Sequence, residues 1–357
     1  MTTPPPAEFM AEQSNLVPLY PNERGLRRWL LACIVSVFLA VGVGGITRLT
    51  ESGLSITEWK PVSGVLPPLS EQGWAEALEK FRQIPQAETT HAGITMSAFK
   101  WIYWWEWFHR LVARGVGLVF AIPFLWFLVR GQLPPPLRLR LAWLPLLTLG
   151  QGVLGWYMVQ SGLTERTEVS AYRLAAHLSL ALAILVVALW SWADLKPRPG
   201  QWLSSRMMQR ASLGIAVLVG ITVVSGAFVA GLRAGRIFNE FPLMGGQVVP
   251  EGYASMVGVW RNAFENPIAA QFHHRVLAIA TALLALAYAW RSHSVDLGAT
   301  QRRTITWLVA AVFTQVTLGI VTLLWAVPVT LGVLHQLTGV VVLCVAVLGV
   351  HSMRHGT

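Results

Sequence analysis

The sequence predicts an all-α integral membrane protein whose eight transmembrane helices form two tandem, pseudo-symmetric four-helix bundles. Three observations lead to this fold class: the composition, the number of long apolar segments and the repetition of several motifs. Of 357 residues, 54% are hydrophobic and 12% are charged, and the mean hydropathy is +0.53. A soluble domain has about 25% charged residues, which it needs to cover its surface. The composition therefore excludes an ordinary soluble enzyme, a disordered regulator and a disulfide scaffold.

Long apolar segments give the number of spans. A bilayer core of about 30 Å requires about 20 apolar residues in a helix. Eight segments meet this length: 28–48, 108–129, 141–161, 172–193, 211–231, 272–290, 304–325 and 329–350. Eight spans place both termini on the same side of the membrane. The polar, proline-rich segment 1–27 has no cleavable apolar region, so we expect a short cytoplasmic tail.

The positions of the basic residues predict the orientation. Lysine and arginine gather before the first span and in the short connections 130–140, 194–210 and 291–303. The positive-inside rule makes this side cytoplasmic. The long loops 49–107 and 232–271 then lie on the outer side of the membrane. Because the net charge of +10 follows this alternation and forms no single basic face, we expect no nucleic-acid partner.

Paired motifs indicate an internal duplication. Three pairs share an offset of 181 residues: Gly45 with Gly226, Pro61 with Pro242, and Gly64 with Gly245. The segments EWFHR (106–110) and QFHHR (271–275) also correspond, as do QGVLG (151–155) and QVTLG (315–319). Two parallel four-helix units explain this pattern. We predict a first half at 28–193, a cytoplasmic linker at 194–210, a second half at 211–350 and a cytoplasmic tail at 351–357.

Four of the nine histidines lie near the outer ends of even-numbered spans. They are His109, His177, His274 and His335. The others comprise His273, beside one of these, and His91, His293, His351 and His355 in loops or in the tail, where no special role is needed. Ionisable side chains inside a membrane are costly and indicate function. Paired imidazoles on facing helices are typical of bis-histidine heme ligation. We therefore expect one heme between His109 and His177 and a second between His274 and His335.

Other metals fit the sequence less well. A tetrahedral zinc site would need further cysteine or carboxylate ligands, and Cys33 and Cys344 lie elsewhere in the apolar segments. A copper site is an alternative that lacks a thiolate or a methionine cluster. His273 is an alternative to His274, but adjacent residues on a helix point about 100° apart, so only one can face the bundle. The His-Arg dipeptide that it shares with His109 favours His274.

Glu106 is the other candidate site residue of the first half. It precedes His109 by three residues, and three roles are open: a proton acceptor, a group that orients the imidazole, or an ion-pair partner of Arg110. The second half has Gln271 in the equivalent place, which cannot titrate. This difference predicts reactive chemistry in the first site, and electron transfer or a structural role in the second.

The basic residues near the histidines have two possible functions. Arg110, Arg114 and Arg275 are natural partners for heme propionates, because a guanidinium binds a carboxylate with two hydrogen bonds. Anchoring to lipid headgroups explains them equally well.

These residues together resemble the heme A synthase family, in particular its alphaproteobacterial and mitochondrial branch. The similar segments extend from the first span to the eighth: GGITRLTESGLS (44–55), EWKP (58–61), EWFHR (106–110), QGVLGWYMVQSG (151–162), FNEFPLMG (238–245), QFHHR (271–275) and HQ (335–336). One branch of that family has a cysteine pair in the first outer loop. This sequence has none there, so no thiol role is carried over.

The resemblance implies an activity and a division of labour. The family oxidises the C8 methyl group of heme O to a formyl group, giving heme A for cytochrome oxidase, with water as the expected oxygen source. It implies that His274 and His335, with Arg275, hold a heme b cofactor. It also implies that the substrate heme O binds near the catalytic candidates Glu106, His109 and His177. If Glu106 accepts a proton, Glu106→Gln should abolish heme A formation and leave the heme content intact.

Two other functions remain open from the sequence. A diheme b-type electron carrier would use the same ligands without changing a porphyrin, and a heme transporter or chaperone would release its heme unchanged. The pathway implies heme O synthase as a partner and an electron acceptor of unknown identity. Membrane lipid and a homo-oligomeric state are further expectations.

Overall fold

The computed structural model describes residues 20, 22–60, 63–163, 168–195 and 205–355. Most of the predicted N-terminal tail, Pro61 and most of the linker 194–210 lie outside the described residues. Within these ranges the chain is helical, and the one extended pairing is an isolated bridge between Met244 and Gln247. An all-α architecture is therefore confirmed for the part of the chain that the structure describes.

Every predicted span is a helix. The eight long helices are α2 (Glu23–Leu49), α5 (Met96–Val129), α6 (Pro135–Leu163), α7 (Ala171–Asp194), α8 (Arg206–Gly231), α10 (Pro267–Ser292), α11 (Ala299–Leu324) and α12 (Val329–His355). Seven of them are long and apolar enough to cross a membrane. Helix α6 is not among the seven, because residues such as Thr148 and Gln151 and several glycines interrupt its apolar segment. The chain is a helical membrane protein.

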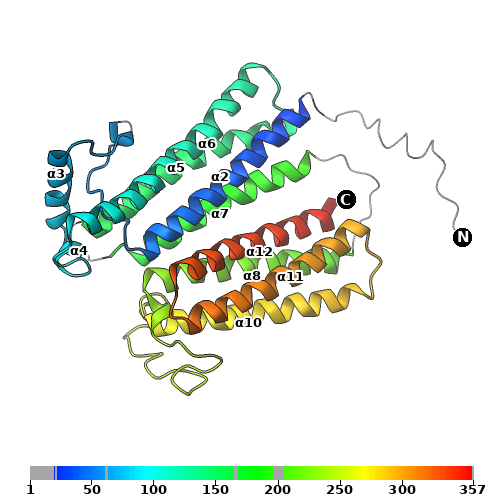
Figure 1. Cartoon of the computed structure of the whole chain (residues 1–357). Helices are drawn as coiled ribbons and strands as arrows, with labels where there is room; N and C mark the ends of the chain where they lie inside the picture. Colours follow the sequence, from blue (N-terminus) through cyan, green and yellow to red (C-terminus); the bar gives the residue numbers. More distant parts are fainter. Residues whose placement is uncertain (1–19, 21, 61–62, 164–167, 196–204, 356–357) are drawn as a thin grey trace, which may run out of the picture.

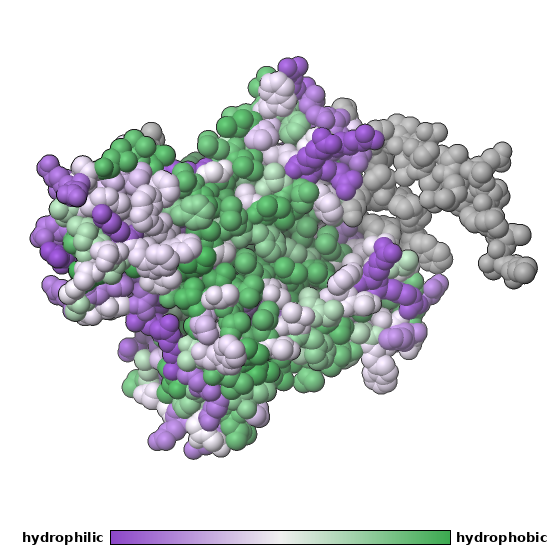
Figure 2. All heavy atoms as spheres, in the orientation of Figure 1, coloured by the Kyte–Doolittle hydropathy of each residue, from purple (hydrophilic) through white to green (hydrophobic). Residues whose placement is uncertain are grey.

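The long helices make two sets of neighbours. Helix α2 contacts α5 and α7, which both contact α6; helix α8 contacts α10 and α12, which both contact α11. The two sets meet where α7 contacts α8 and where α12 contacts α2 and α7. Figure 1 shows the first set above the second, with all the long helices running in similar directions. Figure 2 shows apolar side chains gathered across the middle of the helices and polar side chains toward their two ends, as a lipid environment requires.

The buried apolar core runs through both sets of helices. Leu26 and Leu30 of α2, Leu185 of α7, Met208 of α8 and Val340 of α12 all belong to one cluster, and each is completely shielded from solvent. The two halves are therefore packed against each other without a solvent-filled gap at this level.

Helix boundaries follow from local sequence. Pro267 occupies the first turn of α10, and the Asn266 side chain accepts hydrogen bonds from the amides of Ile268 and Ala269. Such caps satisfy amides that have no partner within the helix. Helix α5 begins at Met96, where Thr95 caps it, twelve residues before the predicted span. It therefore continues into the long loop 49–107.

This N-terminal extension of α5 supports a small cap. The amphipathic helix α3 (Glu71–Arg82) is followed by the short helix α4 (Pro85–Glu88). Trp74 and Phe81 of α3 pack with Phe99 and Tyr103 of α5 in a second apolar cluster. In Figure 1 the cap lies at the same end of the molecule as the loop that follows α8. The N-terminal end of α2 and the C-terminal end of α12 lie at the other end.

Ion pairs join the two halves at the cap end. Arg233, just after α8, lies 3.2 Å from Glu51, just after α2, and 2.8 Å from Glu168, which precedes α7. Arg48 lies 3.1 Å from Glu168 and donates a hydrogen bond to the Ala230 carbonyl of α8. Glu51 and Arg233 both adopt a left-handed backbone conformation, with φ of 57° and 51°. The two chain reversals are therefore similar in shape.

A second link lies at the opposite end. The expected tail begins inside α12, which continues to His355. His351 is buried, its Nε2 lies 2.9 Å from Asp194 Oδ1, and Asp194 also binds Arg140. This histidine therefore joins α12 to the end of α7. Sequence reasoning placed it in a solvated tail because the apolar run of α12 ends at about residue 350.

Candidate functional site

The four histidines occupy two equivalent pairs of helices. His177, His274 and His335 lie about two turns after the first residues of α7, α10 and α12. His109 lies about four turns into α5, because that helix begins earlier. All four side chains are only partly buried, although their helices pack on both sides. Their rings therefore remain accessible to a ligand.

The second-half pair has the geometry of two ligands facing one metal. The ring centroids of His274 and His335 lie 6.3 Å apart and their planes are at 88°. Two imidazoles that share a metal through their Nε2 atoms have centroids about 6 Å apart, since each metal–nitrogen bond is about 2 Å long. The pair therefore needs little movement to bind one iron atom.

A neighbouring hydroxyl sets the tautomer of His274. Ser225 Oγ lies 2.8 Å from His274 Nδ1 and donates its own hydrogen to the Thr222 carbonyl at 2.7 Å. Because a hydroxyl has a single hydrogen, Ser225 accepts from the Nδ1–H of His274. The lone pair then resides on Nε2, the tautomer that ligates metal.

Each imidazole lies against a glycine on the adjacent helix. A Cβ atom placed on Gly44 would come within 3.2 Å of the His109 ring, and one on Gly226 within 3.2 Å of the His274 ring. The corresponding distances are 3.0 Å from Gly155 to His177 and 2.8 Å from Gly319 to His335. Separations this short exclude a larger residue without a shift of the ring. All four rings therefore occupy space that only glycine leaves open.

The repeated Gln-x-x-x-Gly motif places an amide beside two of these rings. One turn before Gly155, Gln151 Nε2 lies 3.4 Å from His177 Nε2; one turn before Gly319, Gln315 Nε2 lies 3.5 Å from His335 Nε2. The Nδ1 atoms of His177 and His335 have no hydrogen-bond partner. Each of these rings therefore has its Nε2 beside a glutamine amide and its Nδ1 without a partner.

His273 faces away from the histidine pair. Its Nε2 lies 2.9 Å from the hydroxyl of Tyr253, in the loop before α10, and the two rings pack edge to face. The structure therefore brings His274, rather than its neighbour, together with His335.

Glu106 is buried and fully hydrogen bonded. Oε1 accepts from Arg110 Nε at 3.0 Å and Nη2 at 2.6 Å, and Oε2 accepts from the Ser55 hydroxyl at 2.8 Å and the Ile56 amide at 2.7 Å. A carboxylate offers about four lone-pair positions, and all four are occupied. Glu106 therefore ties the segment 55–56 to α5.

Arg110 and Arg275 perform the same task in the two halves. Arg110 donates to the carbonyls of Ile56 and Glu58, and Arg275 donates to those of Phe238 and Glu240. Gln271, in the place of Glu106, also donates to Phe238. Each arginine therefore fixes the first residues of an outer loop against the helix that carries a histidine.

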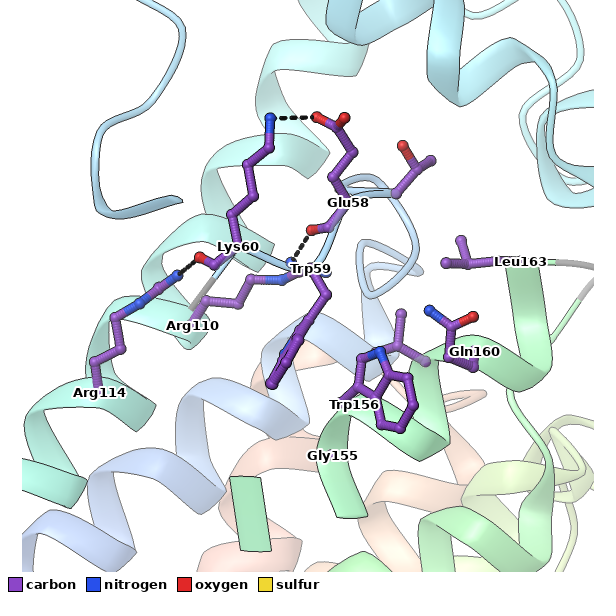
Figure 3. A pocket seen from close by; sticks show the side chains of 11 residues that line it. Glu58, Trp59, Lys60, Arg110, Arg114, Gly155, Trp156, Gln160 and Leu163 are labelled. Carbon is purple, nitrogen blue, oxygen red and sulfur yellow. Dashed lines mark hydrogen bonds and ion pairs between the residues drawn. The ribbon is translucent and has the colours of Figure 1, made fainter. Parts of the chain in front are cut away.

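A cavity of about 90 Å³ opens beside the first-half site (Figure 3). Gly155, which contacts His177, lines it together with two tryptophans, Trp59 and Trp156, whose ring centroids lie 5.6 Å apart. Arg110, Lys60 and Arg114 supply positive charge to its rim, as Figure 3 shows. An aromatic floor with a cationic rim is suited to the carboxylate-bearing edge of a flat apolar ligand.

Glu58 also lines this cavity but is already paired. Lys60 and Lys80 each approach its carboxylate to 3.0 Å, and these hydrogen bonds hold the pKa of the Glu58 carboxyl below its usual range. Glu58 therefore stays ionised and paired with the two lysines.

The residues present fit heme. The donor set at each site is two imidazoles on facing helices, the second pair has the separation that one metal requires, and glycine cradles hold the rings. Arg110 and Arg275 now donate to loop carbonyls, and a heme propionate would have to meet them in these positions.

The structure corrects the register of the repeat. The glycine that corresponds to Gly226 in contacting a histidine is Gly44, not Gly45, so the offset here is 182 residues. The carbonyl pairs Ile56 with Phe238 and Glu58 with Glu240 have the same offset. Sequence reasoning missed the glycine cradles and Ser225. The repeated Gln-x-x-x-Gly motif was the signal for two of the four glycines, Gly155 and Gly319.

Comparison with known proteins gives a consistent result. Residues 27–347 match the COX15-CtaA family of cytochrome oxidase assembly proteins. The heme A synthase of Parvibaculum lavamentivorans is 45% identical over 332 residues, which cover 93% of this chain and 95% of the relative. The heme A synthase of Rhodospirillum centenum is 48% identical over 330 residues, covering 91% and 87%, and that of Bradyrhizobium sp. strain ORS 278 is 47% identical over 342 residues, covering 93% and 92%. The family match and these identities over nearly the whole chain establish that the protein belongs to the COX15-CtaA family of cytochrome oxidase assembly proteins.

Proposed function

We propose that this protein is a heme A synthase, a membrane oxidoreductase that converts the C8 methyl group of heme O to a formyl group. The observation that supports this most directly is the facing pair His274 and His335, repeated in sequence by His109 and His177 and held in each case against glycine. The family and the names of its relatives agree with it.

The second half is proposed to hold a resident heme b. His274 and His335 would hold it, and Ser225 keeps His274 in the tautomer whose Nε2 is free. Arg275 holds the outer loop in place and lies where a propionate could replace a carbonyl as its partner. A bis-histidine heme supplies one-electron transfer. The chain contributes the ligands and a closely packed surrounding that sets their orientation.

The first half is proposed to bind heme O. His109 and His177 are the candidate ligands and catalytic residues, and the Trp59–Trp156 cavity receives the polar edge of the substrate. We take water as the source of the formyl oxygen, with the electrons passing to the proposed electron acceptor.

Glu106 is proposed to position this site. Its four hydrogen bonds hold the Arg110 guanidinium and the Ile56 amide. Acting as a proton acceptor would require one of them to break first. Glu106 therefore supports the rim of the cavity, and the expected catalytic importance of this residue follows from that support.

The membrane arrangement completes the proposal. Helix α6 is taken as the eighth span, so that 28–193 and 211–350 form two four-helix bundles with both termini in the cytoplasm. The heme sites then lie near the periplasmic face of the bacterial inner membrane. Heme O synthase, an electron acceptor, lipid and a second copy of the chain are the proposed partners.

Pigment analysis tests the proposed function. Protein purified from cells that supply heme O is extracted with acid and its hemes are separated by chromatography. Heme A, or a hydroxylated heme O, beside heme b is the expected result. Heme b alone would support an electron carrier, and release of unchanged heme to an acceptor protein would support a transporter.

A further inference from the structure

One contact between the halves lies beside both candidate heme sites. Gln336 follows His335 on α12, and its Nε2 donates a 2.9 Å hydrogen bond to the Val41 carbonyl of α2. A Cβ atom on Gly45 would come within 2.7 Å of Gln336 Oε1. The next residue, Leu337, lies 3.4 Å from where a Cβ on Gly42 would be. The amide is therefore enclosed by one turn of α2.

The same turn of α2 touches the first site. Gly44, between Val41 and Gly45, faces His109, whose Nε2 lies 3.2 Å from the position of a Cβ there. Val41 and Gly45 face Gln336, which is covalently next to His335. A short path therefore joins the two sites. It runs from His109 through the turn of α2 at residues 41–45 to Gln336, which is next to His335.

The equivalent contact on the other side of the molecule is different. Repeat symmetry matches Gln336 with Leu178, which follows His177 on α7, and Gly45 with Ala227 on α8. Helices α7 and α8 are in contact, Ala227 is buried and Leu178 packs in the apolar core. Apolar residues therefore stand at both matched positions, and neither side chain can form a hydrogen bond. The hydrogen-bonded tie is therefore present on one of two otherwise equivalent sides.

We propose that Gln336 is a positioning residue that couples the two heme sites. His109 Nε2 is the ring atom nearest Gly44, so ligation through this nitrogen turns the ring and changes its contact with this turn of α2. Close packing carries the change through α2 to Gln336 and so to the backbone of His335. By linkage, occupancy of the first site then changes the reduction potential of the heme in the second. This inference rests on the proposed function only in requiring that both sites bind a porphyrin.

A potentiometric titration measures this coupling directly. The full-length protein, carrying its second-half heme, is titrated with and without gallium protoporphyrin IX, a redox-inert probe for the first site. Allosteric coupling commonly changes the affinity of one site by about tenfold when the other site is occupied. It corresponds to a shift of about 59 mV in the one-electron potential of the resident heme. No shift in a wild-type protein with both sites loaded would overturn the proposal.

Substitutions assign the coupling to this contact. Gln336→Leu installs the residue of the equivalent position, and Gly45→Ala displaces the amide from the opposite helix while leaving α12 unchanged. Both should load both sites, as absorbance reports, and lose the potential shift. Leu178→Ala, at the matched contact, should keep it. A full shift in Gly45→Ala, or equal loss in Leu178→Ala, would refute the assignment. Failure of the wild-type protein to bind any porphyrin would instead refute the proposed function.

Discussion

The two halves share a scaffold and differ in what surrounds the histidines. Each places two imidazoles against two glycines, and each uses an arginine to hold an outer loop by its carbonyls. The first half has the ion pair of Glu106 with Arg110 and an aromatic cavity, whereas the second has Gln271 and the Ser225 hydroxyl. A duplicated scaffold has thus kept its four histidines while the residues around them diverged.

The residues that differ between the two halves suit different kinds of ligand binding. In the second half, Ser225 pre-sets a ligand tautomer, as suits a group that stays bound. Val43 precedes Gly44 as Ser225 precedes Gly226, and valine has no hydroxyl. In the first half the charge and the aromatic surface are placed at the rim, as suits a ligand that enters and leaves. The comparison agrees with the proposal of a retention site in the second half and an exchange site in the first, and four sets of substitutions test it.

Removal of single ligands should have the largest effect. His274→Ala or His335→Ala should lower the affinity for the resident heme by more than about 100-fold, since even residues that only support a metal ligand are worth 10–100-fold. His109→Ala should retain that heme and form no heme A. Absorbance spectra and extracted pigment report both. Equal loss of pigment in His109→Ala and His274→Ala would contradict the assignment of separate sites.

The next largest effect is expected for Glu106→Gln, which should weaken substrate binding in the first half. Removing one partner of a buried ion pair costs about 3–5 kcal/mol, because the other charge remains buried. Arg110 and the loop would lose their anchor, so KM for heme O should rise more than kcat falls, with the second-half heme retained. Glu79→Gln, an exposed carboxylate of the cap helix α3, is the control. A fall in kcat alone, with KM unchanged, would favour a proton acceptor instead.

Filling a glycine cradle should have an intermediate effect. Gly155→Ala would force the His177 ring to move, at a cost of about 1–3 kcal/mol typical of overpacking. It should reduce porphyrin binding in the first half and leave the second-half spectrum unchanged; Gly226→Ala should do the reverse. Gly152→Ala and Gly220→Ala, which meet open space on the same helices, are matched controls. Indistinguishable binding by Gly155→Ala and Gly152→Ala would show that the ring is not held there.

Exchanging the residues before the cradles should give the smallest change. Ser225→Val removes a hydrogen bond worth about 1 kcal/mol. The imidazole then donates less charge to iron, so the potential of the resident heme should rise while occupancy stays near normal. Ser225→Thr, which keeps the hydroxyl, should leave the potential unchanged. A potential that responds equally to both substitutions would point to packing rather than to the hydrogen bond.

Much of the fold could be predicted, because apolar length determines where a chain can cross a bilayer. The span predicted at 172–193 is α7 (Ala171–Asp194), and that at 304–325 is α11 (Ala299–Leu324). The start of α5 could not be predicted, because Met96–Trp107 is polar and aromatic and is held as helix by packing against α3. For the site, the four histidines stood out as costly groups within apolar segments.

The residues that surround the histidines depend on which helix faces pack together. Short stretches of sequence do not determine that packing. Gly44 and Gly45 are adjacent, and only the contacts distinguish the glycine that faces His109 from the one that faces Gln336. The four bonds to Glu106 likewise come from residues fifty positions away and from the next helical turn. Long-range geometry of this kind is the basis on which we propose a positioning role for Glu106 among the three roles that the sequence left open.

The ion pair between Glu51 and Arg233 has a consequence for how the chain arose. The two residues occupy equivalent places after α2 and α8, with the same left-handed backbone, yet they carry opposite charges and contact each other. Two first halves would bring two glutamates together at this junction, and two second halves would bring two arginines together; either combination repels. An ancestral dimer of identical units could not have contained this pair. The pair therefore favours packing of a first half against a second half over packing of two identical halves at this junction.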